Sequence, residues 1–199
     1  LIKAIFECRE LNHTVFVFVS DHGEMLGDHT LFRKFLPYEG SSGIPLIFYD
    51  PGNLLNMRHN QNISALAELR DIMPTLLDIA DLPIPDSLDG KSLLPIMQGR
   101  AQRVRDSLHS EHTGAEGPEG LGNQFIVTEH DKYIWFTRTG VEQYFDLDRD
   151  PHELHNAIHD PSCQERIASL RQQLVETLQG RAEGYSDGVQ LIPGQKQKP

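Results

Sequence analysis

The sequence predicts an α/β fold, in which part of a mostly parallel sheet with helices precedes a small antiparallel sheet packed on a C-terminal helix. Residues 14–19 and 44–49 are apolar without polar alternation, which is typical of strands buried on both faces of a parallel sheet. Apolar residues recur at helical spacing over 1–11 and 71–80. Short strand-like segments after residue 123, joined by hairpin-length connections, precede an amphipathic helix.

In the first half of the chain, Ile2, Ile5 and Phe6 share one face of the predicted N-terminal helix. The Gly-rich stretch 24–43, with interleaved aromatic residues, predicts a long ordered loop; loops of this length in a compact domain are usually functional or disordered. The elements expected in order are a helix over 1–11, a strand over 14–19, a loop over 24–43, a strand over 44–49, and helices over 71–80 and 92–97.

The composition changes after Gly99, and we predict a boundary between a first domain, 1–104, and a second, 105–199. A Gly-rich loop at 114–122 precedes the antiparallel strands, and a tail at 181–199 follows the last helix. The elements expected in order are strands over 124–128, 133–137 and 142–147, and a helix over 161–178 with Ile167, Leu170, Leu174 and Leu178 facing the sheet.

The charge balance argues against several classes of partner. The 199 residues carry a net charge of -11, which disfavours nucleic acid and anionic membranes because both require basic patches.

No apolar run approaches the roughly 20 residues that span a bilayer. Cys8 and Cys163 are expected to be free thiols. Because the chain starts at Leu1 inside a helical pattern, we expect it to be part of a longer protein; its oligomeric state stays open.

A polar cluster, Asp21-His22-Gly23-Glu24, follows the first predicted strand, where open α/β sheets bind ligands. Asp and His can give a divalent cation one oxygen and one nitrogen ligand, and Gly23 permits the turn that points both at one site. A metal normally needs four to six ligands, so the others must come from elsewhere. A polar loop explains the cluster about equally well.

Three further groups of polar residues have both a functional and a structural interpretation. Lys34 can bind an anionic oxygen, or it can be a surface lysine. His29, after Asp28, can act near a leaving group or can make a loop hydrogen bond. His112, together with His109 and Glu111, can line a substrate pocket or belong to a solvated loop.

Several ordered segments, taken together, are informative: residues 17–29 with Lys34, residues 38–47, 71–79 and 83–94, and Gln143-Tyr-Phe-Asp-Leu-Asp-Arg-Asp-Pro-His-Glu153. Together they resemble the second half of a type I sulfatase, in the alkaline phosphatase superfamily. The resemblance extends over about residues 1 to 180. Its Asp-His form of the metal pair is similar to the choline-sulfatase and phosphonate-monoester-hydrolase branch, and it implies a sulfatase/alkaline phosphatase-like core.

The resemblance also implies roles for the site residues. Asp21 and His22 match the later two ligands of a divalent metal, for which we expect Ca²⁺, with Mn²⁺ as the alternative. Lys34 matches the lysine that contacts the sulfate of a small sulfate-ester substrate and the nucleophile. His29 is placed near the leaving group, and His112 is our second candidate for binding substrate. In the intact enzyme, attack on sulfur by a hydrated formylglycine is implied.

One departure from the family pattern defines what this chain lacks. Formylglycine forms in a Cys/Ser-x-Pro-x-Arg motif, and neither Cys8, Cys163 nor any serine stands in one. The nucleophile and the early acidic ligands are therefore expected in the N-terminal half of the same protein, and this chain alone is expected to be inactive. The alternatives are a phosphonate monoester or phosphodiester hydrolase of the same superfamily, and a non-catalytic binding module.

Overall fold

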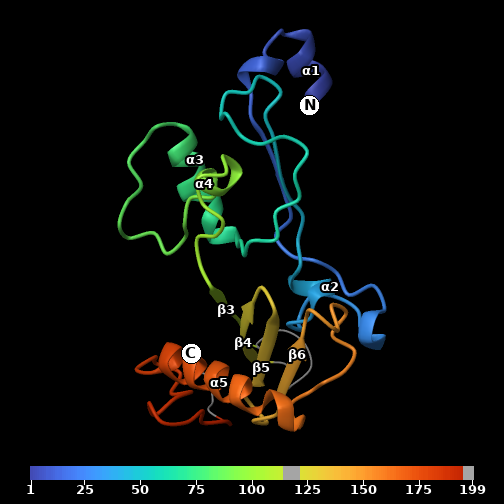
Figure 1. Ribbon diagram of the computed structural model, residues 1–199, viewed down its shortest axis with the longest axis vertical. Helices are drawn as coiled ribbons and strands as arrows, with labels where there is room; N and C mark the ends of the chain where they lie inside the picture. Colours follow the sequence, from blue (N-terminus) through green and yellow to red (C-terminus); the bar gives the residue numbers. More distant parts are fainter. Residues whose placement is uncertain (114–121, 195–199) are drawn as a thin grey trace. The chain divides into compact units, whose positions relative to one another are not determined.

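A computed structural model describes residues 1–113 and 122–194 (Figure 1). The chain forms two compact units, each built from two segments: Leu1–Asp21 with Ile44–Asp106, and His22–Gly43 with Ser107–Pro199. The Gly-rich loop predicted at 114–122 lies outside the described residues except for Gly122, as does the end of the predicted tail, 195–199. The predicted division into domains 1–104 and 105–199 stays a prediction.

The first unit contains a two-stranded antiparallel sheet, β1-β2, in which Phe16 pairs with Tyr49 and Val19 with Leu46. The mixed α/β class is confirmed, but these two strands are antiparallel neighbours and not the parallel ones we predicted. A crossover between parallel strands usually contains an α-helix long enough to span the sheet, whereas the connection between these strands contains only a 3-10 turn and the four-residue helix α2, Glu39–Ser42. The elements of this unit are α1 Ile2–Glu7, a 3-10 turn Leu11–His13, β1 Phe16–Val19, β2 Leu46–Tyr49, a 3-10 turn Leu69–Asp71, α3 Ile72–Ile79 and α4 Leu94–Met97.

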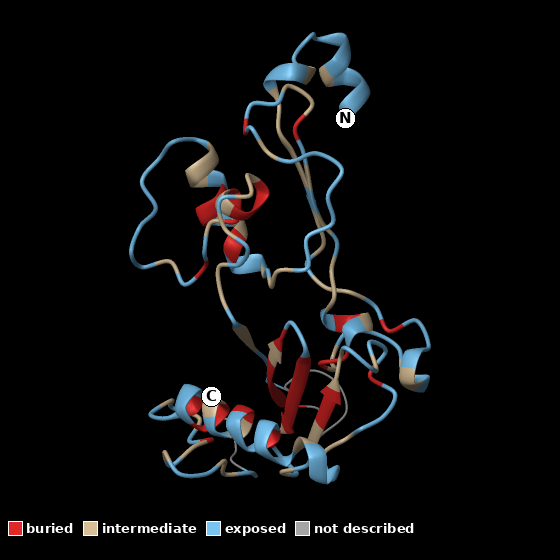
Figure 2. Cartoon of the chain, in the orientation of Figure 1, coloured by how far each residue is buried: buried red, intermediate tan, exposed pale blue. Residues whose placement is uncertain are grey.

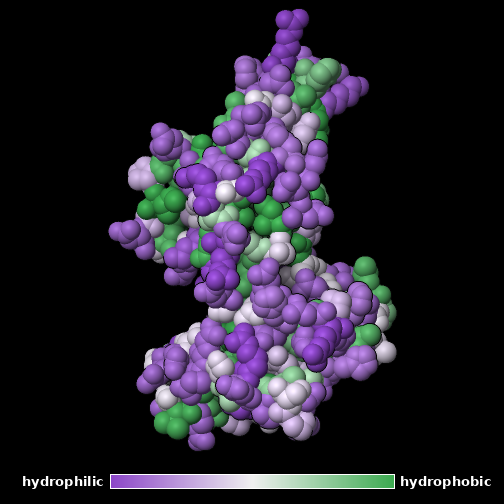
Figure 3. Space-filling view, in the orientation of Figure 1, coloured by the Kyte–Doolittle hydropathy of each residue, from purple (hydrophilic) through white to green (hydrophobic). Residues whose placement is uncertain are grey.

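Only one face of this strand pair is covered in the first unit. Leu46 and Phe48 pack against a cluster formed by Leu55 and the residues of and before α4. On the opposite face Phe18, Ile47 and Tyr49 are exposed by 62%, 54% and 48%. On α1 the apolar residues Ile2 and Phe6 are also exposed. Figure 2 colours the exposed residues of this unit pale blue, and Figure 3 shows apolar residues on its surface in green. We predicted that these strands are buried on both faces; within the described residues only one face is buried.

The second unit is built on a four-stranded antiparallel sheet in the order β3-β4-β5-β6. Three strands match the predicted meander, and β3 was missed because its sequence, Ser-Leu-His-Ser-Glu-His, is polar. It pairs with β4 over six residue pairs and lies at the end of the strand order, so it is an edge strand, where polar side chains are tolerated. The strands are β3 Ser107–His112, β4 Asn123–Thr128, β5 Asp131–Phe136 and β6 Glu142–Asp146.

One face of this sheet is covered by the C-terminal helix, as predicted. The helix, α5 Gln164–Leu178, follows a 3-10 turn at Pro161–Cys163, and all four residues expected to face the sheet are buried. They pack against Ile126, Tyr133, Trp135 and Tyr144, whose side chains alternate along the strands with those of the other face.

The other face of the sheet is covered by the segment 22–43. Met25 and Tyr38 from this segment form one buried cluster with Phe125, Ile134 and Phe145 from three strands. The segment contains a 3-10 turn, Asp28–Thr30, and the short helix α2, Glu39–Ser42, which the sequence did not predict. The predicted long loop is thus an ordered layer of the second unit. No helix among the described residues has both the length and the apolar character needed to cross a bilayer.

Candidate functional site

The two strongest candidates, His22 and Lys34, meet in the structure. The Lys34 Nζ lies 2.8 Å from the His22 Nε2, and the His22 Nδ1 lies 2.7 Å from the Gly23 carbonyl oxygen. A carbonyl only accepts, so the proton of a neutral His22 belongs on Nδ1. Its Nε2 then carries the lone pair and accepts from the lysine. The same lone pair is what a metal would bind, and a second ring nitrogen held by a carbonyl is the usual support of a metal-binding histidine.

A local turn brings the two residues together across twelve positions of sequence. The Glu24 carboxylate accepts the Arg33 backbone N–H, and the Met25 N–H donates to the Arg33 carbonyl at 3.1 Å. Inside this turn the Gly27 N–H donates to the Leu31 carbonyl at 2.8 Å. These bonds place Arg33 opposite Glu24, so Lys34 emerges beside the start of the segment.

Gly23 is needed for close packing. Its N–H donates to the Ser41 carbonyl at 2.8 Å, and a Cβ on this residue would collide with the Gly40 and Gly43 carbonyl oxygens. We expected Gly23 to supply an unusual turn conformation, but its φ is not among the positive values. The glycine instead lets the chain after His22 lie directly against α2.

His29 is oriented by a buried tyrosine. Its ring stacks on Tyr38, with 4.2 Å between the centroids and 7° between the planes. The Tyr38 hydroxyl donates to the Gln143 side-chain oxygen at 2.9 Å, and burial raises the pKa of this hydroxyl. The backbone of His29 is left-handed, with φ at 52°, a conformation that non-glycine residues seldom adopt and that often marks functional sites. Tyr38 was not among our predicted site residues.

The three candidate residues of β3, His109, Glu111 and His112, lie on two different faces of the sheet. His112 lies on the face covered by segment 22–43, where its ring meets the edge of Phe35 at 5.4 Å, next to Lys34 in sequence. His109 and Glu111 lie on the face covered by α5, and both bond to Gln124. Burial alone would raise the pKa of Glu111, but bonds from Arg181 and Gln124 lower it. Glu111 is therefore engaged in structure.

The donor chemistry at the start of the segment fits a divalent metal. Asp21 is exposed and precedes His22 in the chain, and a carboxylate oxygen and an imidazole nitrogen are both donors that a divalent cation accepts. Over residues 1–113 and 122–194, no group of three or more His, Cys, Asp or Glu side chains converges as a metal site would require. The two residues fit as part of a ligand set, and the prediction that other ligands come from elsewhere remains a prediction.

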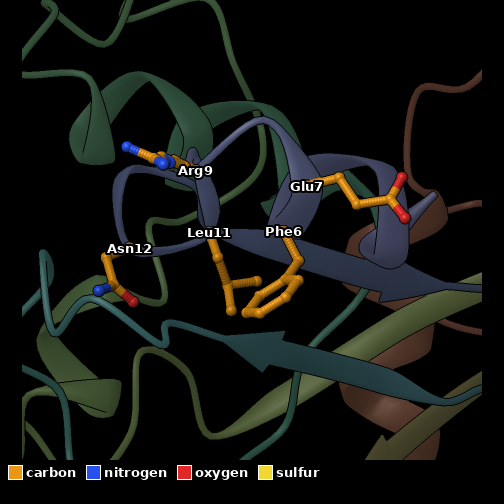
Figure 4. Close-up of a pocket in the computed structure, with 5 residues that line it drawn as sticks. All are labelled: Phe6, Glu7, Arg9, Leu11 and Asn12. Atoms are coloured by element: carbon orange, nitrogen blue, oxygen red, sulfur yellow. The ribbon is translucent and has the colours of Figure 1, made fainter.

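A separate pocket of about 460 Å³ lies near the N-terminus (Figure 4). It is lined by Phe6, Glu7, Arg9, Leu11 and Asn12, all of the first unit. The Phe6 and Leu11 side chains lie side by side and point the same way. None of the predicted site residues lines this pocket, so it gives no support to their assignment.

Comparison with known proteins gives a consistent result. Residues 27–180 match the family described as N-sulphoglucosamine sulphohydrolase, C-terminal. An arylsulfatase of Clostridium perfringens is 50% identical over 191 residues, which are 96% of this chain and 39% of that protein. The chain thus spans well under half the length of this relative.

Two solved structures have the same fold and are more than 25% identical in sequence to this chain over the aligned region. One, solved in complex with its substrate D-glucosamine-2-N,6-O-disulfate, has a TM-score of 0.80 and 26% identity, covering 89% of this chain and 36% of that one. The phosphonate monoester hydrolase of Agrobacterium radiobacter has a TM-score of 0.73 and 28% identity, covering 87% and 36%.

Proposed function

Because the chain belongs to the sulfatase family and matches its C-terminal domain over residues 27–180, we propose that it supplies part of the divalent-metal and sulfate-binding site of a sulfuric ester hydrolase. The observation that carries the proposal is the position of Lys34, whose Nζ lies 2.8 Å from the His22 Nε2, directly after Asp21 in the chain. A metal bound to this Nε2 would replace the lysine there and leave the ammonium available to a substrate oxygen. A metal ligand and a cation beside each other are what binding of a sulfate group requires.

In this proposal Asp21 and His22 hold the cation, with Ca²⁺ as the expected metal and Mn²⁺ as the alternative. The bound cation contributes positive charge that stabilises the nonbridging oxygens of the substrate. The nucleophile, expected to be formylglycine, belongs to the N-terminal half of the same protein, because Cys8 and Cys163 lack the required motif. This chain alone is then expected to be inactive.

The other side chains act on the substrate oxygens. The exposed Lys34 ammonium binds a nonbridging oxygen, where charge builds up as the sulfur–oxygen bond to the leaving alcohol breaks. His29, its ring plane held by Tyr38, gives a proton to the leaving oxygen. His112 extends the same face and contacts the organic part of the small sulfate ester.

A second candidate is hydrolysis of phosphonate monoesters or phosphodiesters. It is favoured by the Asp-His form of the metal pair and by the similarity to the phosphonate monoester hydrolase. Comparing an aryl sulfate and an aryl phosphonate monoester as substrates of the longer polypeptide decides between the two. A kcat/KM that is higher for the phosphonate overturns the sulfatase proposal, and tight metal binding without either activity favours a binding module.

The role of Lys34 is tested by Lys34→Met in the longer polypeptide. We expect kcat for an aryl sulfate to fall about 10²- to 10³-fold, as on removal of other charge-stabilising donors. Arg33→Met is the matched control, because it removes an equal charge from the exposed neighbouring residue. Equal effects of the two substitutions would contradict a specific role for Lys34.

A further inference from the structure

A buried ion pair holds the segment 22–43 on the sheet of the second unit. Lys132 on β5 and Glu153 after β6 are 1% and 2% exposed, and their Nζ and Oε1 lie 2.5 Å apart. The Lys132 Nζ also donates to the Pro37 carbonyl at 3.0 Å. The second Glu153 oxygen, Oε2, accepts the Glu39 N–H at 2.6 Å. The pair therefore contacts the backbone on both sides of Tyr38.

The cost of this arrangement argues for a role beyond stability. Burying two charges requires removing both from water, and well-packed apolar residues often stabilise a core equally well. Here the charges contact two backbone groups that an apolar pair would leave without partners. A third anchor is nearby, since the Asn123 side-chain amide donates to the Phe35 carbonyl at 3.2 Å. The backbone from 35 to 39 is thus held at three points, directly after Lys34.

The local backbone of Glu153 directs its side chain inward. Glu153 closes the Asp-Pro-His-Glu turn, where its N–H donates to the Asp150 carbonyl at 3.0 Å. Its φ is 56°, so the turn adopts a left-handed conformation at a residue other than glycine. Such conformations persist only where surrounding contacts hold them. The contacts here are with Lys132 and with the backbone N–H of Glu39.

We propose that Lys132 and Glu153 are positioning residues for the sulfate-binding site. They fix Pro37 and Glu39, which flank the tyrosine on which His29 stacks, and they hold the chain that follows Lys34. Neither side chain touches substrate. This inference rests on the proposed function of Lys34 and His29, and it assigns a role to the Asp-Pro-x-Glu turn.

The test uses the longer polypeptide with Lys132→Met, and with the double substitution Lys132→Met/Glu153→Gln. The single variant leaves a buried carboxylate without its cation, so its melting temperature falls. The double variant removes that charge and keeps an oxygen for the Glu39 N–H, so its melting temperature recovers. Its kcat for an aryl sulfate should nevertheless stay about 10- to 10²-fold low, because Pro37 has lost its donor. The amides of residues 34–39 should also exchange faster with solvent.

Arg171→Met is the matched control. Arg171 pairs with Glu142 at 2.5 Å on the same sheet, but it joins β6 to α5 on the opposite face. It should lower the melting temperature without changing kcat or the exchange of residues 34–39. A double variant that recovers both stability and kcat, or exchange that is unchanged, overturns the proposal. If the wild type hydrolyses no sulfate ester, the proposed function fails, and amide exchange alone decides whether the pair positions the segment.

Discussion

His22 has one ring nitrogen committed to a carbonyl and one directed at a cationic side chain. The first contact fixes the tautomer, and the second shows that the Nε2 lone pair is accessible to a positive charge. The strand-end position made His22 a candidate ligand in the sequence, and the family resemblance implied the metal-binding role. The sequence could not predict which nitrogen is available, because that depends on the backbone turn after His22.

Metal binding by this residue can be measured directly. Calorimetric titration of the longer polypeptide with Ca²⁺ and with Mn²⁺ should show tight binding to one of them. Asp21→Ala and His22→Ala should each weaken it by at least about 10²-fold, since loss of even a supporting residue costs up to that much. Asp86→Ala, which removes an exposed carboxylate elsewhere, should have no effect. Unchanged affinity in His22→Ala would remove this residue from the ligand set.

At the scale of elements, β5 and α5 are joined by a charged contact as well as by the apolar core. Arg166 on α5 donates to both carboxylate oxygens of Asp131, at 2.6 Å and 3.0 Å. Burial alone would raise the pKa of Asp131, but the bonds from Arg166 and Thr128 lower it below its ordinary value. The folded state therefore favours the charged carboxylate at the start of β5.

Because of this contact, the free energy of unfolding of the second unit should decrease at low pH. Because the folded pKa of Asp131 is lowered, its contribution is complete above the unfolded pKa of about 4 and is lost as pH falls through the folded value. Asp131→Asn should lower the free energy of unfolding by about 1.5 kcal/mol at pH 7, at the low end for charged hydrogen bonds because Arg166 is half exposed. Urea unfolding of the wild type and Asp131→Asn in a series from pH 7 down to pH 2 tests this. A difference in unfolding free energy that does not shrink as the pH falls would contradict it.

The amphipathic helix and the meander were predictable because their apolar periodicity is local. The edge strand β3 and the helix α2 were not, since their sequences are polar or rich in small residues. The pairing partner of β3 and the sheet beneath segment 22–43 decide their conformation. The burial of Lys132 could not be predicted from the sequence either, because a lysine in a strand is usually exposed. Its partners here come from the distant residues 37, 39 and 153.

At the scale of the whole molecule, one face of β1-β2 carries three exposed apolar side chains, Phe18, Ile47 and Tyr49. In the relatives the matched region is little more than a third of the protein. We propose that the N-terminal half of the same protein covers Phe18, Ile47 and Tyr49. This would complete the burial on both faces that the strand sequences predict.

A charge placed on this face tests the proposal. Ile47→Lys should destabilise the longer polypeptide by at least about 2 kcal/mol, because a buried ammonium without a partner is costly. Ile63→Lys is the control, since Ile63 is 48% exposed, close to the 54% of Ile47, but lies in a loop. Thermal unfolding of both variants measures the difference, and equal melting temperatures would leave this face without a covering partner.

The sequence by itself determined the class of the fold, the strands and helices with strong apolar patterns, and the residue types available for chemistry. These properties depend on neighbours within a few positions, or on ordered motifs that can be matched directly. Only the tertiary structure decided that Lys34 meets His22 and that Tyr38 orients the ring of His29. It also decided that His112 and Glu111 lie on opposite faces of the sheet. The burial of Lys132 likewise could be known only from the structure. Each of these contacts depends on how distant segments pack, because the partners are brought together by the fold and not by their spacing.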